Sequence, residues 1–338
     1  MDTKNNSLEQ ETPEEEKLFT SLRAHSWDEF IGQQTVKESL QIAITAANER
    51  KDALDHTLFY GPPGLGKTTL SCLIAQEMGT QIKITSGTAL TKVGDIAAIL
   101  TNLQPGDVLF IDEIHRLPKI IEETLYPVME DFALDIIIGK GPSARTIRLD
   151  IPHFTLVGAT TRYGLLAGPF RDRFGLIHQL SYYEPETLVS IVTATAAKLQ
   201  VEISAENALE IARRARGTPR IALKLLKRVR DFVQVRGEKA TEKDTVKHAL
   251  DMIAIDTLGL DAPDRMLLHK LITRHNGGPV GISTLAATLH EDTITIEEVI
   301  EPYLMQMGLL QRTPQGRIAT PAAYMHLGLP LPPKDAAQ

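Results

Sequence analysis

The chain has 338 residues, of which 43% are hydrophobic and 23% charged, and its formal net charge is −7. This length allows two or three domains with real hydrophobic cores. A net negative charge excludes a protein that coats nucleic acid through its global field, so any DNA contact has to be local. The single cysteine, Cys72, excludes an internal disulfide framework and a cysteine-rich metal site.

Residues 1–20 are expected to form a disordered acidic tail. The first sixteen are polar and acidic, and they lack the basic-then-apolar start of a secretory signal. No stretch approaches the roughly 18 to 20 uninterrupted apolar residues that a membrane span requires. Because a lone thiol also suits a reducing compartment, we expect a cytoplasmic protein with no membrane partner.

A phosphate-binding loop is predicted directly after the apolar run at 58–60. Residues 61–68 read Gly-Pro-Pro-Gly-Leu-Gly-Lys-Thr, which fits G-x-x-x-x-G-K-[ST]. In this pattern backbone N–H groups surround the phosphates, Lys67 reaches the outer phosphates and Thr68 offers its hydroxyl to Mg²⁺. A helical pattern follows, which disfavours the alternative of a turn in a generic α/β domain. The expected ATP contacts here are Gly64, Leu65, Gly66, Lys67, Thr68 and Thr69.

Four short apolar runs between residues 57 and 160 alternate with helical patterns and predict a parallel sheet. The expected strands are residues 57–60, 81–85, 107–111 and 154–159. Residues 108–111 are continuously apolar, which is typical of strands covered on both faces. We therefore expect helices on both sides of the sheet.

Two adjacent carboxylates end the strand expected at 107–111. Asp112 is expected to hold Mg²⁺ through water, and Glu113 to polarise the water that attacks the γ-phosphate. A surface Asp-Glu pair is common, but this one follows a buried strand about 45 residues beyond the phosphate loop, which favours catalysis. His115 is interpreted as structural or interfacial, because a carboxylate already occupies the position of the base.

Polar residues also follow the strand expected at 154–159. Thr161 is expected to lie beside the γ-phosphate and to sense its hydrolysis. Arg173 is interpreted as an arginine that one subunit supplies in trans to the site of its neighbour. Such an arginine raises the rate of hydrolysis by about 10³ to 10⁵. A surface salt bridge is the alternative. Pro219 suits a first helical turn, so Arg220 can point back at the phosphates.

Residues 184–255 are predicted to form a small helical domain. The basic run at 213–239 alternates with apolar residues, which favours an amphipathic helix over a nucleic-acid-binding run. After a Gly/Asp/Pro-containing boundary near 256–263, the pattern predicts helices at 264–275, from Ser283 and at 295–307.

Two short strands, joined by a turn at 314–316, follow these three helices and predict a winged helix-turn-helix. Arg312 and Arg317 are expected at the two sides of the wing, as phosphate contacts insensitive to DNA sequence. A winged helix that binds protein is the alternative.

The order of these motifs resembles AAA+ ATPases and, among them, the RuvB family. The motifs are the phosphate loop, Phe-Ile-Asp-Glu-Ile-His-Arg at 110–116, Gly-Ala-Thr-Thr-Arg at 158–162, Arg-Asp-Arg-Phe-Gly at 171–175 and Gly-Thr-Pro-Arg at 217–220. The resemblance runs from about Leu22 to Gly328 and implies an α/β fold in three domains. These are a large AAA+ P-loop domain with a parallel sheet at 21–183, a small helical lid at 184–255 and a winged-helix head at 256–338.

The resemblance implies a hexameric ring that uses ATP and Mg²⁺ to drive branch migration of Holliday junctions along duplex DNA. It also implies two partner proteins: RuvA, which binds the junction core, and RuvC, which is the resolvase. In this family Arg173 would be the arginine finger and Arg220 the second sensor. The further nucleotide contacts that it implies are Leu22, Arg23, Glu130, Asp131, Phe132 and Tyr183.

Apolar arms at 134–138 and 146–149 around Gly139-Lys140-Gly141-Pro142 predict a β-hairpin. In the family this hairpin docks RuvA, which agrees with an apolar patch for a partner; a hairpin buried in the ATPase core is the alternative. The chain departs from the family pattern at Gln315, which removes one candidate phosphate contact, and at Thr293 and Ile294 before the long helix.

Two other functions share parts of this pattern. A clamp loader or replication initiator would have the same ATPase core, but the winged helix and the apolar hairpin favour the junction motor. A nucleotide-switched regulator could hold a promoter with its winged helix. Asp112 and Glu113 argue against it, since a binding switch needs no carboxylate that activates water.

Overall fold

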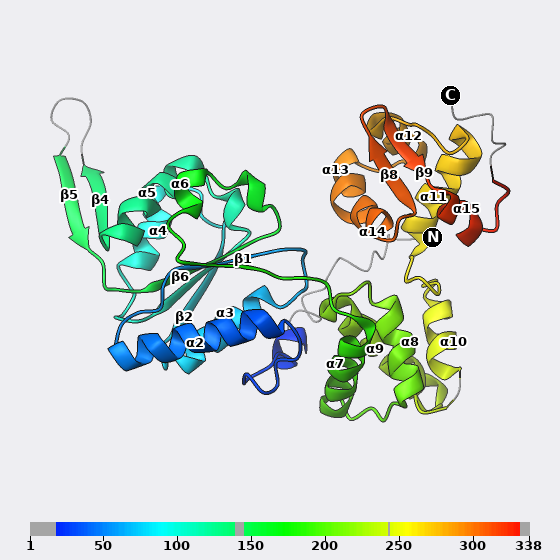
Figure 1. Cartoon of the computed structure of the whole chain (residues 1–338), viewed down its shortest axis with the longest axis horizontal. Helices are drawn as coiled ribbons and strands as arrows, with labels where there is room; N and C mark the ends of the chain where they lie inside the picture. The colour runs from blue at the N-terminus through cyan, green and yellow to red at the C-terminus, as the bar shows by residue number, and fades with distance from the viewer. Residues whose placement is uncertain (1–17, 139–144, 243, 332–338) are drawn as a thin grey trace. The chain divides into compact units, whose positions relative to one another are not determined.

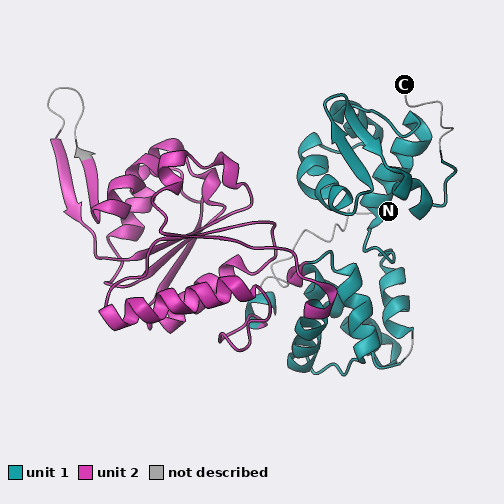
Figure 2. Cartoon of the chain, viewed as in Figure 1, with its two compact units in different colours: residues 1–21, 188–217, 221–338 teal, residues 22–187, 218–220 magenta. Residues whose placement is uncertain are grey.

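The computed structural model describes residues 18–138, 145–242 and 244–331. The expected acidic tail lies almost wholly outside these residues, as does the expected hairpin tip. The chain divides into two compact units (Figure 2). The unit that we call the first, coloured magenta and labelled unit 2 in Figure 2, holds residues 22–187 and 218–220. The second, coloured teal and labelled unit 1, holds residues up to 21, 188–217 and those from 221 onward.

The first unit is built on a five-stranded parallel sheet with the strand order β2-β3-β6-β1-β7. The strands are β1 (Thr57–Tyr60), β2 (Ile82–Ser86), β3 (Val108–Asp112), β6 (Thr155–Thr160) and β7 (Leu176–Gln179). The first four confirm the expected strands to within about a residue. The sequence pattern missed β7, because this edge strand has no buried residue and no continuous apolar run.

Helices lie on both sides of this sheet, as expected (Figure 1). The helices α2 (Gln34–Arg50) and α3 (Lys67–Glu77) pack on each other, and α3 also contacts β3 and β6. The helices α4 (Val93–Leu100) and α5 (Lys119–Glu130) lie on the opposite side. A one-turn helix, α6 (Gly168–Arg171), follows β6.

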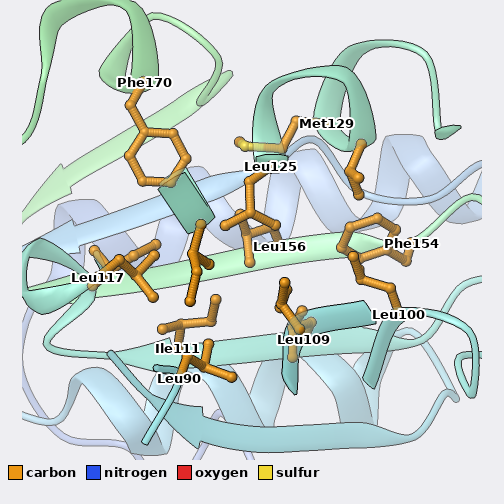
Figure 3. Close-up of a cluster of buried hydrophobic side chains, with 14 of the residues drawn as sticks. Leu90, Leu100, Leu109, Ile111, Leu117, Leu125, Met129, Phe154, Leu156 and Phe170 are labelled. Carbon is orange, nitrogen blue, oxygen red and sulfur yellow. The ribbon is translucent and has the colours of Figure 1, made fainter. Parts of the chain in front are cut away.

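A continuous apolar core joins α4 and α5 to the sheet (Figure 3). Leu109 and Ile111 of β3 and Leu156 of β6 are inaccessible to solvent and pack with Leu125 of α5. Burying each such side chain stabilises the fold by roughly 1.5–3 kcal/mol. The core therefore holds the carboxyl ends of β3 and β6, where the polar residues predicted to be functional begin.

The expected β-hairpin is present as β4 (Ala133–Ile138) and β5 (Arg145–Asp150), paired antiparallel. Leu134, at its base, is buried in the core of the first unit. Along β5 the side chains are mostly exposed, and that of Ile147 is 44% exposed. The hairpin therefore combines a buried base with an exposed apolar side chain, and neither of the two interpretations describes it alone.

The second unit begins with the helical region and continues into the winged helix. The helical region comprises α7 (Pro185–Lys198), which begins in the first unit, with α8 (Ala205–Arg214), α9 (Pro219–Arg236) and α10 (Thr245–Met252). The basic run falls mainly on α9, whose apolar residues Ile221, Leu225, Leu226 and Val229 are buried. This confirms the amphipathic helix.

The winged helix contains the three expected helical segments and the two wing strands. They are α11 (Ala262–His275), α12 (Ile282–Leu289), a third helix over residues 293–306, β8 (Leu310–Thr313), β9 (Gly316–Ala319) and a final α15 (Pro321–His326). The third helix is not uniformly α-helical, because a π-helical turn (Ile296–Ile300) separates α13 (Thr293–Thr295) from α14 (Glu301–Gln306). Pro302 lacks an N–H group and so disturbs the regular ladder at this point.

Within the described residues, no helix combines the length and the apolar character needed to cross a membrane.

Candidate functional site

The phosphate loop connects β1 to α3, with α3 beginning at Lys67. Gly64 has a φ of 77°, and a Cβ atom there would lie 2.9 Å from the Cβ of Arg220. Only glycine therefore allows Arg220 to pack against the loop, where its backbone N–H donates to the Gly64 carbonyl at 3.4 Å. The first N–H groups of α3 have no partner within the helix, so this end favours an anion.

Lys67 is buried beneath this loop. Its Nζ donates to the carbonyl oxygens of Gly61 and Pro62, each at 2.8 Å. Burial lowers the pKa of Lys67 to about 8, while the charges of Asp112 and Glu113 oppose this shift. Thr68 and Thr69 follow in the first turn of α3, both half-buried. The phosphate loop thus holds the Lys67 ammonium group close to the end of β3.

Asp112 and Glu113 stand at the carboxyl edge of the sheet, at the end of β3. Burial raises the pKa of Asp112, and the Glu113 charge adds to this, whereas Lys67 and Arg220 lower it. The charges of Lys67, Asp112, Glu113 and Arg220 therefore lie close enough to act on one another.

Magnesium is commonly held by one or two carboxylates together with substrate phosphates. The Asp112 carboxylate and the Thr68 hydroxyl are oxygen ligands of that kind, so the donor set fits this ion. Among the described residues there is no group of three or more His, Cys, Asp or Glu side chains that could hold a metal ion by itself.

The Glu113 carboxylate is held by Thr161, just after β6, and by His115, two residues further along the chain. Its Oε2 accepts hydrogen bonds from the Thr161 hydroxyl at 3.0 Å and the Thr161 N–H at 3.4 Å, and it lies 3.1 Å from His115 Nδ1. The same His115 nitrogen lies 2.9 Å from the Thr160 hydroxyl. The sensing role of Thr161 stays a prediction, but the contact gives it a direct route to Glu113.

A cavity of about 330 Å³ opens beside the loop. Tyr183, which lines it, is buried and donates its hydroxyl to the Leu65 carbonyl at 3.2 Å, and burial raises its pKa to about 12. The Gln33 side-chain amide bonds the backbone of Ser181 on both its N–H and its carbonyl. The cavity is lined by Gly32, Gln33, Gln34, Thr35, Val36, Gln179, Ser181, Tyr182, Tyr183, Glu184 and Thr187. A space of this size next to a phosphate loop suits a nucleoside.

Sequence reasoning placed only Tyr183 in this cavity and missed the segment at 32–36, whose residues carry no recognisable motif. The other two expected contacts, Leu22 and Arg23, are half-buried. Arg23 hydrogen-bonds Cys72 of α3, which lowers the pKa of that thiol, although burial has the larger effect and raises it.

Arg173 contacts the C-terminal part of α5. Its Nη2 donates to Glu130 Oε2 at 3.1 Å, and its guanidinium carbon is 4.3 Å from the centre of the Tyr126 ring. Asp131 accepts a bond from Arg148 at 2.8 Å, and Phe132 stacks on His153. The structure thus brings Arg173 together with Glu130, whereas Arg220 is the arginine whose charge acts on Lys67 and Asp112.

Arg312 and Arg317 face each other across the wing, on β8 and β9. The Arg312 side chain is 53% exposed and bonds Glu297 at 3.0 Å. The Arg317 side chain is only 7% exposed, and it bonds Glu301 at 2.6 and 3.1 Å and Glu297 at 2.8 Å. The two arginines do lie at the two sides of the wing, and their contact with DNA phosphates stays a prediction; the Arg317 guanidinium, however, is already paired with Glu297 and with the buried Glu301 of α14.

The residues at which the chain departs from the family pattern are all at least partly accessible. Gln315, at the wing tip, is exposed. Ile294 is 66% exposed, and Thr293 is half-buried at the start of the third helix.

A phosphate loop after β1, paired carboxylates at the end of β3 and a polar residue after β6 define an AAA+ P-loop nucleoside triphosphatase, here with a helical lid and a winged helix. Three family models match in succession: the P-loop domain of the Holliday junction DNA helicase RuvB over residues 22–180, the RuvB AAA lid domain over 183–256 and the RuvB C-terminal winged-helix domain over 257–328. The chain belongs to the RuvB family and is an ATP-hydrolysing enzyme of the helicase type.

Solved structures agree with this assignment. The Holliday junction branch migration motor RuvB of Thermotoga maritima is 50% identical over 92% of this chain and 99% of its own, with a TM-score of 0.83. A lysine-to-arginine variant of the same protein is also 50% identical over 92% of this chain and all of its own, with a TM-score of 0.84.

Proposed function

We propose that this protein is the subunit of a homohexameric ring that hydrolyses ATP to move duplex DNA. This movement would drive branch migration of Holliday junctions during recombination and DNA repair. One observation carries the proposal beyond family membership: Glu113, the candidate base, is bonded to Thr161, the residue just after the neighbouring strand β6, beside the Lys67 loop. A hydrolytic site needs such a carboxylate, and a purely binding switch does not. We also propose that the protein is cytoplasmic.

In the proposed reaction the loop at 61–68 and Lys67 bind the phosphates, and Tyr183 lines the nucleoside cavity. Magnesium, when bound, neutralises charge on the phosphates. Glu113 takes the proton of the attacking water, and this requires its carboxylate to turn from Thr161 toward the substrate. Thr161 would then report the change through the end of β6.

Arg173 would act on the site of a neighbouring subunit rather than on its own. Its bond with Glu130 supports this, because Glu130 ends α5 with a side chain that is 58% exposed, where a neighbouring subunit could reach the pair. Glu130, Asp131 and Phe132 would contact the neighbour's nucleotide from the same surface. An arginine supplied in this way makes each site incomplete without its neighbour, which would coordinate hydrolysis around a ring.

Arg312 is the residue we propose as the principal phosphate contact of the wing, and Arg317 would contribute mainly by fixing the wing. The adjoining helix presents Glu297 and Glu298, which disfavours insertion of this face into a groove lined by phosphates. Contact through the wing would therefore be insensitive to DNA sequence.

The hairpin β4–β5 is proposed as the docking surface for RuvA, supported by the exposed Ile147 on an otherwise anchored hairpin. RuvC would join as the resolvase. We also propose domain boundaries at residues 21, 184 and 256.

The test is ATP-dependent dissociation of a synthetic four-way junction, with and without RuvA, against a linear duplex of the same length. We expect dissociation of the junction, stimulated by RuvA. A protein that hydrolyses ATP equally on both DNAs and leaves the junction intact would overturn the motor function.

A further inference from the structure

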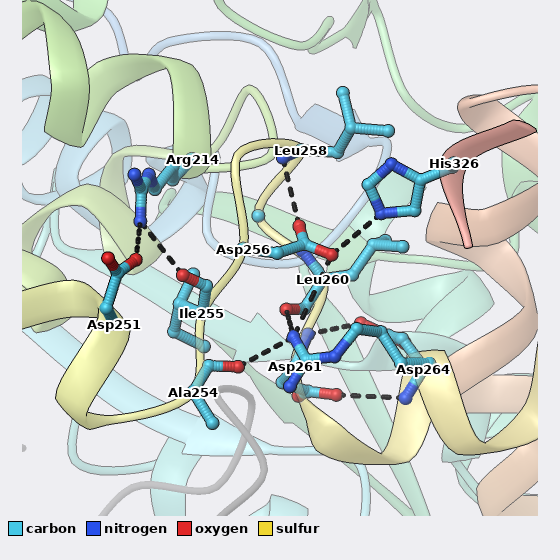
Figure 4. Close-up of polar contacts among 12 residues, drawn as sticks. Arg214, Asp251, Ala254, Ile255, Asp256, Leu258, Leu260, Asp261, Asp264 and His326 are labelled. Atoms are coloured by element: carbon cyan, nitrogen blue, oxygen red, sulfur yellow. Dashed lines mark hydrogen bonds and ion pairs between the residues drawn. The ribbon is translucent and has the colours of Figure 1, made fainter. Parts of the chain in front are cut away.

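The linker at residues 256–261, between α10 and α11, is held by the winged-helix domain (Figure 4). One oxygen of Asp256 accepts the N–H groups of Leu258 and Leu260, both at 2.9 Å, and the other lies 2.8 Å from Nε2 of His326. The Tyr303 hydroxyl donates to the Leu258 carbonyl at 2.5 Å. The linker is therefore an ordered part of the winged-helix fold and not a flexible tether.

The helical domain holds the same linker from its other side. Arg214, the last residue of α8, donates to the Ile255 carbonyl at 2.9 Å. Gly259 has a φ of 77°, and a Cβ there would lie 2.5 Å from the Arg214 carbonyl oxygen, so the two backbones touch. Arg265 of α11 reaches back and donates to the carbonyls of Ala254 and Leu260, at 2.8 and 2.7 Å.

Arg216 is the centre of this junction. Its side chain is only 4% exposed. Its Nε donates to the Gly259 carbonyl at 2.9 Å, its Nη2 donates to Asp264 at 2.5 Å, and its guanidinium carbon lies 4.6 Å from the centre of the Tyr303 ring. A single side chain of the helical domain thus contacts the linker, the start of α11 and α14. Arginine is suited to this role, because its planar group can hydrogen-bond and stack at the same time.

The partners of Arg216 make the junction depend on its charge. Asp261 and Asp264 cap the start of α11, each accepting the backbone N–H of the other. Arg216 lies 2.5 Å from Asp264 and 3.5 Å from Asp261, and all three side chains are buried. Burial raises the pKa of Asp264 to about 7, and the Arg216 charge opposes this. Without Arg216, two buried carboxylates would face each other with no cation between them.

Arg216 also stands four residues before Arg220 in the chain. Between them the chain passes into the other compact unit, to which residues 218–220 belong. There the backbone of Arg220 bonds Gly64 of the phosphate loop, and its charge acts on Lys67 and Asp112. One short segment therefore has the nucleotide loop at one end and the winged-helix junction at the other.

We propose that Arg216 is a positioning residue that transmits the state of the nucleotide loop to the winged-helix domain. The helical domain and the winged helix then move together when a nucleotide displaces Arg220, and the wing follows. The consequence for DNA movement rests on the proposed function; the coupling between the nucleotide and the linker does not.

The first test measures amide hydrogen exchange of the linker by mass spectrometry, on the full chain, with and without a non-hydrolysable ATP analogue. In the wild type we expect the analogue to change the exchange rate of residues 256–261 by about tenfold, a common size of coupling between sites. Arg216→Met should lose this response. Arg213→Met, which changes an exposed residue in the last turn of α8, three positions earlier, should keep it. A wild type without a response, or an Arg216→Met protein that keeps it, overturns the proposal.

The second test compares junctions dissociated per ATP hydrolysed. Arg216→Met should lower this ratio about tenfold with KM for ATP changed by less than about threefold. Arg216→Lys, which keeps the charge, should recover part of the ratio. If the wild type fails to dissociate junctions, the motor function fails, while the exchange experiment still decides the role of Arg216. Should Arg216→Met not fold, as judged by circular dichroism, Asp264→Asn removes the same ion pair and must give the same two losses.

Discussion

The nucleotide site and the winged-helix domain use charged side chains in different ways. At the edge of the parallel sheet, Asp112 and Glu113 are only half-buried; Glu113 bonds the Thr161 side chain and Lys67 bonds loop carbonyls, which are partners that a ligand could replace. In the winged helix, Arg317 and Glu301 are buried against each other. The first arrangement keeps charges available for a substrate, whereas the second uses charge to fix one element against another. The physical difference is access to solvent, which motifs do not encode.

The largest expected effect is on the rate of ATP hydrolysis and comes from a substitution of Arg173. Arg173→Ala should lower the rate of ATP hydrolysis by about 10³ to 10⁵ and leave nucleotide binding intact. Arg171→Ala, which changes the neighbouring arginine on the Tyr163 ring, should stay near the wild-type rate. Steady-state hydrolysis and titration with a fluorescent nucleotide measure the two quantities.

Mixing subunits shows whether Arg173 acts in trans. Lys67→Ala should abolish nucleotide binding, so neither variant hydrolyses ATP by itself. Rings that mix Lys67→Ala with Arg173→Ala subunits pair an intact loop with an intact arginine and should recover part of the activity. No recovery in mixed rings would contradict the assignment in trans.

The next effect concerns Glu113. Glu113→Gln should lower hydrolysis by about 10² to 10⁴, because the amide cannot take a proton from water, yet it can still accept the Thr161 hydrogen bond. Nucleotide affinity should change little. Glu123→Gln, an exposed site on α5, is the matched control. Normal turnover in the Glu113→Gln protein would rule out its role as the base.

Substitutions of Arg317 and Arg312 should change the stability of the winged helix rather than the rate of ATP hydrolysis. Arg317→Met leaves Glu301 buried without its partner, which costs roughly 3–5 kcal/mol. Arg312→Ala removes an exposed ion pair worth less than about 1 kcal/mol. Hydrogen exchange of the β8 and β9 amides measures the local opening free energy in both proteins.

DNA binding separates these two arginines further. Arg312→Ala should reduce the dependence of log affinity on log salt concentration by about one unit. Arg317→Met/Glu301→Met, which removes the whole buried pair, should recover most of the stability and keep the wild-type salt dependence. A reduced slope in the double variant would show that Arg317 contacts phosphate as well.

The smallest effect is a pH dependence in the first unit. His56 is buried: its Nδ1 accepts the Leu156 N–H, its Nε2–H donates to the Met129 carbonyl, and burial lowers its pKa below the usual value of 6.5. Below about pH 6.5 the unfolded chain takes up a proton that the folded one resists, so stability falls as the pH falls. The slope is at most about 1.4 kcal/mol per pH unit. The slope should flatten in His56→Gln during denaturation between pH 7 and 5, and it should also flatten in His178→Gln, because burial lowers that pKa too.

Much of the fold could be predicted because its signals are local. The loop at 61–68, the apolar strands of the sheet and the order of helices and wing strands each follow from residues adjacent in sequence. The strand β7 was missed because its side chains alternate at a sheet edge, and the π-helical turn because the 3 and 4 spacing of its apolar residues is that of an ordinary α-helix. The cavity segment 32–36 was missed because it has no motif.

By itself the sequence determined the family and the nucleotide loop and predicted Asp112 and Glu113 as the catalytic carboxylates, because each depends on residue types at a set spacing. Only the tertiary structure decided which charges face solvent. It buried Arg317 against Glu301 and Arg216 against Asp264, while leaving Arg312 exposed. The reason is that burial and pairing depend on contacts between residues far apart in the chain, and those contacts exist only once the helices and strands have packed.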